Sequence, residues 1–250
     1  MQVNEKTEVK NIKKNCNPCF IIMKRELSSY FNSPVAYIVT ALFLILTGSF
    51  FMSVFYLNRN ASLRNLFTLF PMILPAFVPA LTMRLYAEEK KSGSLETLLT
   101  LPVSDFQVAM GKFLSAFIAS AIMIAPTLIY LVGIVPFGKP DIGPVIGGYA
   151  ASLLLCALFS SIGLFASSIT KNQIVSFFVG AGICYVLSLI DVFMFFMPSA
   201  FVKFCQYISA NAHFTSVSQG VLDTRDLIYF ISMTCVFFCL TVITQKKSRE

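Results

Sequence analysis

Six long stretches of this chain carry no charged side chain, and they limit its fold more than any other feature. They run between Glu26 and Arg59, Arg64 and Arg84, Lys112 and Lys139, Asp141 and Lys171, Lys171 and Asp191, and Asp226 and Lys246. Each has room for the roughly 20 apolar residues that a helix needs to cross a bilayer. A spanning backbone must satisfy its own hydrogen bonds, as a helix or a closed barrel does. Runs such as ALFLILTGSFF lack the alternation of barrel strands, so the sequence predicts an all-α integral membrane protein.

Composition agrees with a membrane protein. The chain is 56% hydrophobic and 12% charged, whereas soluble domains carry about a quarter charged residues. We expect one membrane domain over residues 20–245, between polar tails at 1–19 and 246–250. Its six transmembrane helices are expected at roughly 35–57, 66–86, 112–136, 144–168, 173–196 and 227–245. The first apolar span is too long for a cleaved signal peptide.

The distribution of lysine and arginine predicts the orientation. With six spans, the two termini and the loops after spans 2 and 4 share one side, which holds fourteen Lys and Arg against five on the other. The side richer in Lys and Arg is cytoplasmic in most membrane proteins. We therefore expect a multi-pass protein with both termini in the cytoplasm. Nucleic acid is not an expected partner, because the basic residues are dispersed and lack interleaved aromatics.

The segment before the first span has an amphipathic helical pattern. Its apolar positions are Phe20, Met23, Leu27, Tyr30 and Phe31, and its polar positions are Lys24, Arg25, Glu26, Ser28 and Ser29. Such a pattern predicts a helix that lies on the membrane surface and ends near Pro34. The alternative is a simple extension of the first span. Membrane lipid is accordingly an expected partner.

Prolines and polar residues mark three further places. Pro71, Pro75 and Pro79 are four residues apart in the second span, where they could bend a helix that lines a pathway or adapt it to packing. Pro126 should kink the third span. Residues 197–226 are too polar to span and too apolar for a free loop, so we expect short re-entrant or surface helices on the outer side.

The chain lacks the motifs of a self-sufficient catalyst. A phosphate-binding loop needs G-x-x-x-x-G-K-[ST], but Gly111-Lys112 has Phe106 at the upstream glycine position. His213 is the single histidine, and Cys16-x-x-Cys19 supplies only half of a zinc site. We expect no catalytic residues, no metal site and no cofactor within the chain.

Two other classes of function remain open at this stage. A polytopic membrane enzyme acting on lipid would need clustered acidic, His or Ser residues, and the chain offers Glu88, Glu89 and Glu96 without a nearby histidine. An ion-coupled secondary transporter would need buried carboxylates near the middle of the membrane. Asp191 is the one carboxylate within a predicted span, and it lies near the outer end.

The polar interval EEKKSGSLETLLTLPVSDFQVAMGK, residues 88–112, separates the second and third spans. Gly93 and Ser94 can start a helix of about two turns, which Pro102 ends. Its apolar stripe is Leu95, Leu98 and Leu99, with Glu96 in the first turn. So short a helix needs support from a partner or from the protein itself. The interval is therefore either a packed hairpin or a docking helix for a cytoplasmic subunit.

This interval resembles the loop between spans 2 and 3 of ABC-2-type ABC transporter permeases. Other stretches are most similar to the gliding-motility-associated permease branch of that family. They are KRELSSYFNSPVAY (24–37), PALTMRLYAEEK (79–90), DIGPVIGGY (141–149), IGLFASSITKNQIVSFF (162–178) and HFTSVSQGVLDTRDLIYF (213–230). The resemblance covers about residues 23–245.

The resemblance implies a permease subunit, of exporter type, in the bacterial cytoplasmic (inner) membrane. It implies two copies of an ABC ATP-binding subunit, which bind ATP and Mg, and a second permease that is identical or a paralogue. By the same resemblance, the surface helix at about Phe20–Phe31 and the coupling helix at about Ser94–Leu101 contact the ATPase. Glu88 and Glu89 match an acidic pair at the end of the second span. His213, Gly220 and Asp226 match an outer re-entrant motif.

Overall fold

The computed structural model describes residues 18–58, 63–93, 103–134, 141–193, 205–220 and 223–249, and within these ranges it contains helices and turns but no strand. The helices are α2 (Pro18–Asn32), α3 (Pro34–Asn58), α4 (Arg64–Thr82), α5 (Arg84–Ser92), α7 (Asp105–Ile124), α8 (Leu128–Ile134), α9 (Ile142–Ile169), α10 (Gln173–Phe193), α12 (Ala210–Ser218) and α13 (Thr224–Arg249). Residues 205–208 are also helical, and a 3-10 turn (Ala125–Thr127) joins α7 to α8.

The predicted all-α class with six spans is confirmed. Helical segments long and apolar enough to cross a membrane are Pro34–Phe55, Arg64–Ser92, Asp105–Gly133, Ile142–Ile169, Gln173–Val192 and Thr224–Lys247. The second span continues through α5 beyond its predicted end, and the third begins seven residues before the predicted residue 112, at Asp105. Helix α13 extends to Arg249, into the segment expected to be a polar tail.

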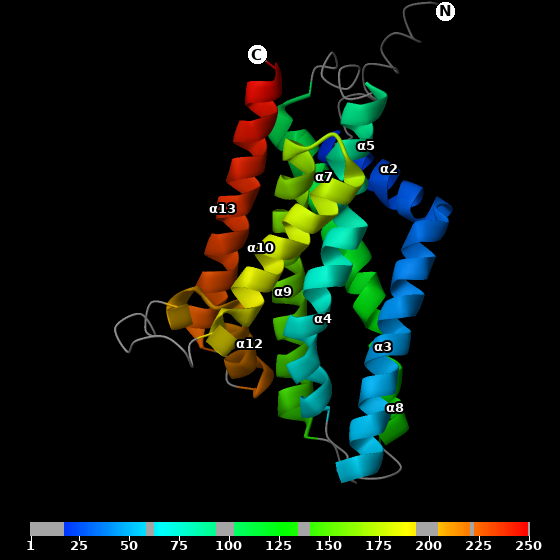
Figure 1. Cartoon of the computed structure of the whole chain (residues 1–250), viewed down its shortest axis with the longest axis vertical. Helices are drawn as coiled ribbons and strands as arrows, with labels where there is room; N and C mark the ends of the chain where they lie inside the picture. Colours follow the sequence, from blue (N-terminus) through cyan, green and yellow to red (C-terminus); the bar gives the residue numbers. More distant parts are fainter. Residues whose placement is uncertain are drawn as a thin grey trace, which may run out of the picture.

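Helix α9 is the centre of the bundle, and α4, α10, α12 and α13 pack around it (Figure 1). Small residues allow this close packing. A Cβ atom on Gly163 would lie 1.9 Å from Thr82 Oγ1, and one on Gly148 would lie 2.3 Å from the Phe67 ring. In contrast, α3 and α13 bury little of their surface against the chain. Their exposed apolar side chains suit contact with lipid.

The prolines of the second span serve packing. Pro71, Pro75 and Pro79 are all buried inside an α4 that continues unbroken to Thr82. Pro126 lies in the 3-10 turn between α7 and α8, so the predicted interruption of the third span is confirmed. Residues 210–218 form α12, one of the short helices expected before the last span.

Helix α2 lies across one end of the bundle at a steep angle to the spans, as expected for a surface helix (Figure 1). It ends at Asn32, and Pro34 opens α3, where a missing N–H costs little. Helix α5 and the C-terminal end of α13 lie at the same end of the bundle. We call this end the α2 end.

Candidate functional site

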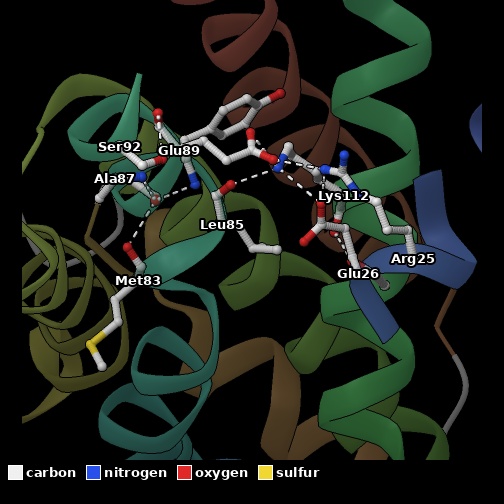
Figure 2. Close-up of polar contacts among 11 residues, drawn as sticks. Arg25, Glu26, Met83, Leu85, Ala87, Glu89, Ser92 and Lys112 are labelled. Atoms are coloured by element: carbon white, nitrogen blue, oxygen red, sulfur yellow. Dashed lines mark hydrogen bonds and ion pairs between the residues drawn. The ribbon is translucent and has the colours of Figure 1, made fainter. Parts of the chain in front are cut away.

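The candidate site is a group of four charged side chains at the α2 end, Arg25, Glu26, Glu89 and Lys112, which we call the Lys112 cluster (Figure 2). It joins helices that are far apart in the sequence. Arg25 and Glu26 come from α2, Glu89 from α5 and Lys112 from α7. The two cations balance the two carboxylates, so the cluster is neutral as a whole.

Lys112 is the centre of the cluster, and its side chain has no exposed surface. Its Nζ donates to the Leu85 carbonyl oxygen at 2.6 Å. Nζ also lies 2.8 Å from Glu89 Oε2 and 3.3 Å from Glu26 Oε1. The ammonium group stands 4.9 Å from the centre of the Tyr86 ring, within the range of a cation–π interaction. A buried charge is tolerated only when it is paired and hydrogen-bonded in this way.

Arg25 closes the cluster on its solvent side, with 53% of its side chain exposed. Its Nη2 lies 2.6 Å from Glu26 Oε1 and 2.8 Å from Glu89 Oε1. Burial would raise the pKa of Glu26, but the charges of Lys112 and Arg25 outweigh it and hold that pKa below its ordinary value. Burial lowers the pKa of Arg25, but the two carboxylates outweigh it, so both groups stay ionised around neutral pH.

Local sequence brings α2 and α7 close enough for this contact. Ser104 and Gln107 form a reciprocal capping box that starts α7, and Asp105 stands in its positive first turn. Two turns later, a Cβ atom on Gly111 would lie 2.8 Å from the Cys19 carbonyl oxygen and 2.9 Å from Ile22 Cβ. Only glycine permits this approach, and the next residue is the lysine that reaches α2.

A serine of α9 fixes the other side of α5. Ser167 Oγ accepts hydrogen bonds from the Tyr86 and Ala87 backbone N–H groups, each at 3.0 Å, and donates to the Met83 carbonyl oxygen at 2.9 Å. Inserting a hydroxyl into the helical ladder interrupts a helix. These contacts lie where α4 and α5 separate, at Met83, four residues after the last proline.

The predicted residues of the second–third interval are only partly within the described chain. Glu89 belongs to the Lys112 cluster, and the exposed Glu88 lines a cavity of about 380 Å³ between α2 and α5. Gly93 ends α5 in the left-handed conformation, with φ of 73°. The remaining predicted coupling residues lie outside the described residues: Ser94, Leu95, Glu96, Leu98, Leu99 and Pro102.

The side chains predicted for the interfacial helix differ in their exposure in α2. Glu26, expected on the polar face, has a side chain that is 13% exposed and turns toward Lys112. Phe20 was expected on the apolar face and is 60% exposed. Met23 and Leu27 are half-buried, and Lys24 is exposed. The contact of Glu26 with Lys112 could not be expected from the pattern of α2 alone, because its partner lies on α7.

Two residues of the predicted outer motif, His213 of α12 and Asp226 of α13, lie in contact. His213 Nδ1 lies 2.6 Å from Asp226 Oδ1, and the imidazole stacks on Tyr229 with ring centres 4.1 Å apart. Gly220 has φ of 88° and seats the end of α12 on α9, where a Cβ atom on Gly147 would lie 3.0 Å from Gly220 Cα. The described residues contain no group of three metal-ligating side chains.

Sequence reasoning missed two residues of the site. Lys112 was noted only as the second residue of a Gly-Lys pair, and Ser167 was not singled out. The sequence does contain a signal for Lys112. A Gly-Lys pair opens one apolar span, and an acidic pair follows the span before it. Ser167 leaves no comparable trace, because its partners are backbone groups.

These features define a polytopic helical membrane domain whose charged end is built from three helices. A family model described as ABC-2 family transporter protein matches residues 56–244. The chain therefore belongs to the ABC-2 family of transporter proteins, as a multi-pass membrane subunit of an ABC transporter that is not catalytic alone. Membership implies an ABC ATP-binding partner. No curated protein matches the chain.

Proposed function

We propose that this chain is the permease subunit of an ABC exporter, which moves its substrate with energy from ATP hydrolysed by a separate ATP-binding subunit. The observation that carries the proposal is the buried Lys112 of α7, which holds α2 and α5 at once. Helix α5 ends at Ser92, immediately before the predicted coupling helix at Ser94–Leu101. A push on that helix reaches α2 and α7 through charged contacts.

The contacts favour motion of these helices as one unit. Separating α5 from α7 would take from the buried Lys112 ammonium its nearest carboxylate, Glu89, and the Leu85 carbonyl oxygen, which is costly. On its other side, α5 is tied to α9 through Ser167 and through Lys90, whose Nζ donates to the Ser168 carbonyl oxygen. In this proposal the motor moves α2, α5 and α7 together and so shifts the packing around α9.

The full complex would hold two ATP-binding subunits, which supply the ATP and Mg sites, and a second permease. We propose that both chain termini and the α2 end face the cytoplasm of a bacterial inner membrane, in agreement with the distribution of Lys and Arg. The sequence similarity also supports placing the chain near the gliding-motility-associated branch. The substrate is not part of the proposal.

The test uses a charge placed on the coupling helix. The chain is co-expressed with a candidate ABC ATP-binding subunit from the same genome, and the complex is purified through a tag on the permease. Leu98→Asp and Leu99→Asp should leave a folded permease that recovers at least tenfold less ATPase, because an apolar anchor in an interface becomes charged. Thr97→Asp, which adds the same charge on another face of the turn, is the matched control and should retain the subunit.

Full recovery of the ATP-binding subunit with both Leu98→Asp and Leu99→Asp, together with normal ATP turnover, would refute the docking role of this segment.

A further inference from the structure

A cavity of about 830 Å³ opens beside the first turns of α13 and carries no assigned role. Its wall combines side chains of residues 205–208, α12 and α13. Ligand sites have volumes of about 300–1,000 Å³, with mainly apolar walls and a few placed polar groups. Here the apolar wall includes Ile208, Ile228 and Met233, and the polar groups include His213, Arg225 and Asp226.

The carboxylate of Asp226 is the distinctive group of this cavity. The residue is 6% exposed, and its Oδ1 is paired with His213 Nδ1 at 2.6 Å. Its other oxygen, Oδ2, is buried and accepts no hydrogen bond from the described residues. A buried acceptor left without a donor is costly. The cavity therefore favours a ligand that brings an N–H or O–H donor, and a charged donor most of all.

The cavity extends along α13 from a polar rim into the apolar part of the span. Arg225, Ile228 and Ser232 lie three and four residues apart, so they share one face of the helix. Thr224 opens both α13 and the sixth candidate span, so Arg225 stands at the first turn of that apolar segment. At about 1.5 Å per residue, Met233 lies about 12 Å further along the helix axis. The cavity thus has a polar rim at the start of the apolar segment and an apolar wall further along it.

We propose that this cavity binds a zwitterionic aminophospholipid. The lipid ammonium donates to Asp226, its phosphate pairs with the exposed guanidinium of Arg225, and its hydrocarbon lies against Ile228 and Met233. Phosphatidylethanolamine has this combination of groups. Phosphatidylcholine has the same net charge and phosphate, but its quaternary ammonium has no N–H to donate to Asp226. The proposal does not depend on ATP-driven transport.

Native mass spectrometry of the full chain, delipidated in detergent, tests the preference. Phosphatidylethanolamine and phosphatidylcholine with identical acyl chains are titrated separately. We expect phosphatidylethanolamine to bind about tenfold more tightly, since one charge-assisted hydrogen bond distinguishes the two headgroups. Arg225→Gln should weaken binding of both lipids by a similar factor, because both carry the phosphate. Equal affinity of the two lipids for the unchanged chain overturns the proposal.

Two isoleucines of α13 provide the matched control for position. Ile228 lines the cavity and is 61% exposed, whereas Ile231 is 58% exposed and is not part of the wall. Ile228→Ala should weaken phosphatidylethanolamine binding several-fold, and Ile231→Ala should leave it unchanged. Circular dichroism and size-exclusion chromatography check that each variant is folded. Identical binding by the two alanine variants would show that the lipid does not occupy this cavity.

Discussion

Replacing Lys112 with methionine removes the central cation of the Lys112 cluster and keeps a side chain of similar length. The change leaves two carboxylates, Glu26 at 13% and Glu89 at 16% exposed, without their buried partner. It also leaves the Leu85 carbonyl oxygen without the donor that stands 2.6 Å away. Removing one member of a buried ion pair costs about 3–5 kcal/mol. We expect Lys112→Met to lower the free energy of unfolding by this amount.

The measurement is thermal unfolding of the purified chain in detergent. A loss of about 3–5 kcal/mol corresponds to a midpoint lower by on the order of 10 °C for a chain of this size. Lys91→Met is the matched control, because Lys91 is exposed at the same end of the bundle. Its midpoint should change by less than about 2 °C, since surface charges contribute little.

A double variant distinguishes the ion pair from the packing of the lysine stem. Glu89→Gln alone should destabilise the chain, because the ammonium of Lys112 then loses its nearest carboxylate at 2.8 Å. Combined with Lys112→Met, it should cost less than the sum of the two single changes by about 1–3 kcal/mol. Strict additivity, or a Lys112→Met variant as stable as the parent chain, would refute the role assigned to the cluster.

Three further predictions concern the surroundings of the cluster. Gly111→Ala should destabilise the chain by about 1–3 kcal/mol, because the new methyl group would meet the backbone of α2 at 2.8 Å. Gly182→Ala, whose new methyl group would have no neighbour within 4 Å, is its control in the same thermal assay. Ser167→Ala should cost about 1–3 kcal/mol by leaving backbone N–H groups of α5 without an acceptor, whereas Ser168→Ala removes only a bond within α9. The pKa of Glu26 is lower in the folded chain than its value of about 4.3 in the unfolded chain. Its ionised form therefore contributes to stability above the unfolded pKa, and this contribution is lost as the pH falls through the folded pKa. Unfolding midpoints should therefore fall more steeply below about pH 4 in the parent chain than in Glu26→Gln, and parallel curves would contradict this assignment.

The spans could be predicted from the sequence because a helix that crosses lipid needs a continuous apolar stretch, which can be found without knowing the fold. A bilayer requires about 20 residues without charge, and the gap between Asp141 and Lys171 contains α9 almost exactly where the charges end. Capping is equally local. Ser104 and Gln107 lie three residues apart, so the start of α7 is set by neighbouring residues, although the charge pattern alone places the start of the third span at residue 112. The segments predicted on these grounds needed no knowledge of which helices are neighbours.

The cluster could not be predicted in the same way. A lysine at the start of an apolar span is usually expected to extend its ammonium group into the water-facing interface. Lys112 does the reverse, because α2 covers it and supplies Glu26 from 86 positions earlier in the chain. The break at Met83 is another such case. The three prolines left open whether the second span bends or adapts to packing. The interruption follows them, at Met83, whose carbonyl oxygen accepts a hydrogen bond from Ser167 of α9.

The two kinds of contact around α5 differ in a way that matters for transmission of movement. Glu89 of α5 forms ion pairs with Lys112 of α7 and with Arg25 of α2, each at 2.8 Å. These contacts tolerate small rotations because charge attraction depends weakly on direction. The bonds to Ser167 are three hydrogen bonds on a single hydroxyl, and their strength falls steeply with misalignment. A displacement of α5 therefore strains its junction with α9 before it separates α5 from Lys112. We therefore expect movement of α5 to be taken up first at the interrupted backbone at Met83, which lies between the charged end and the buried prolines of α4.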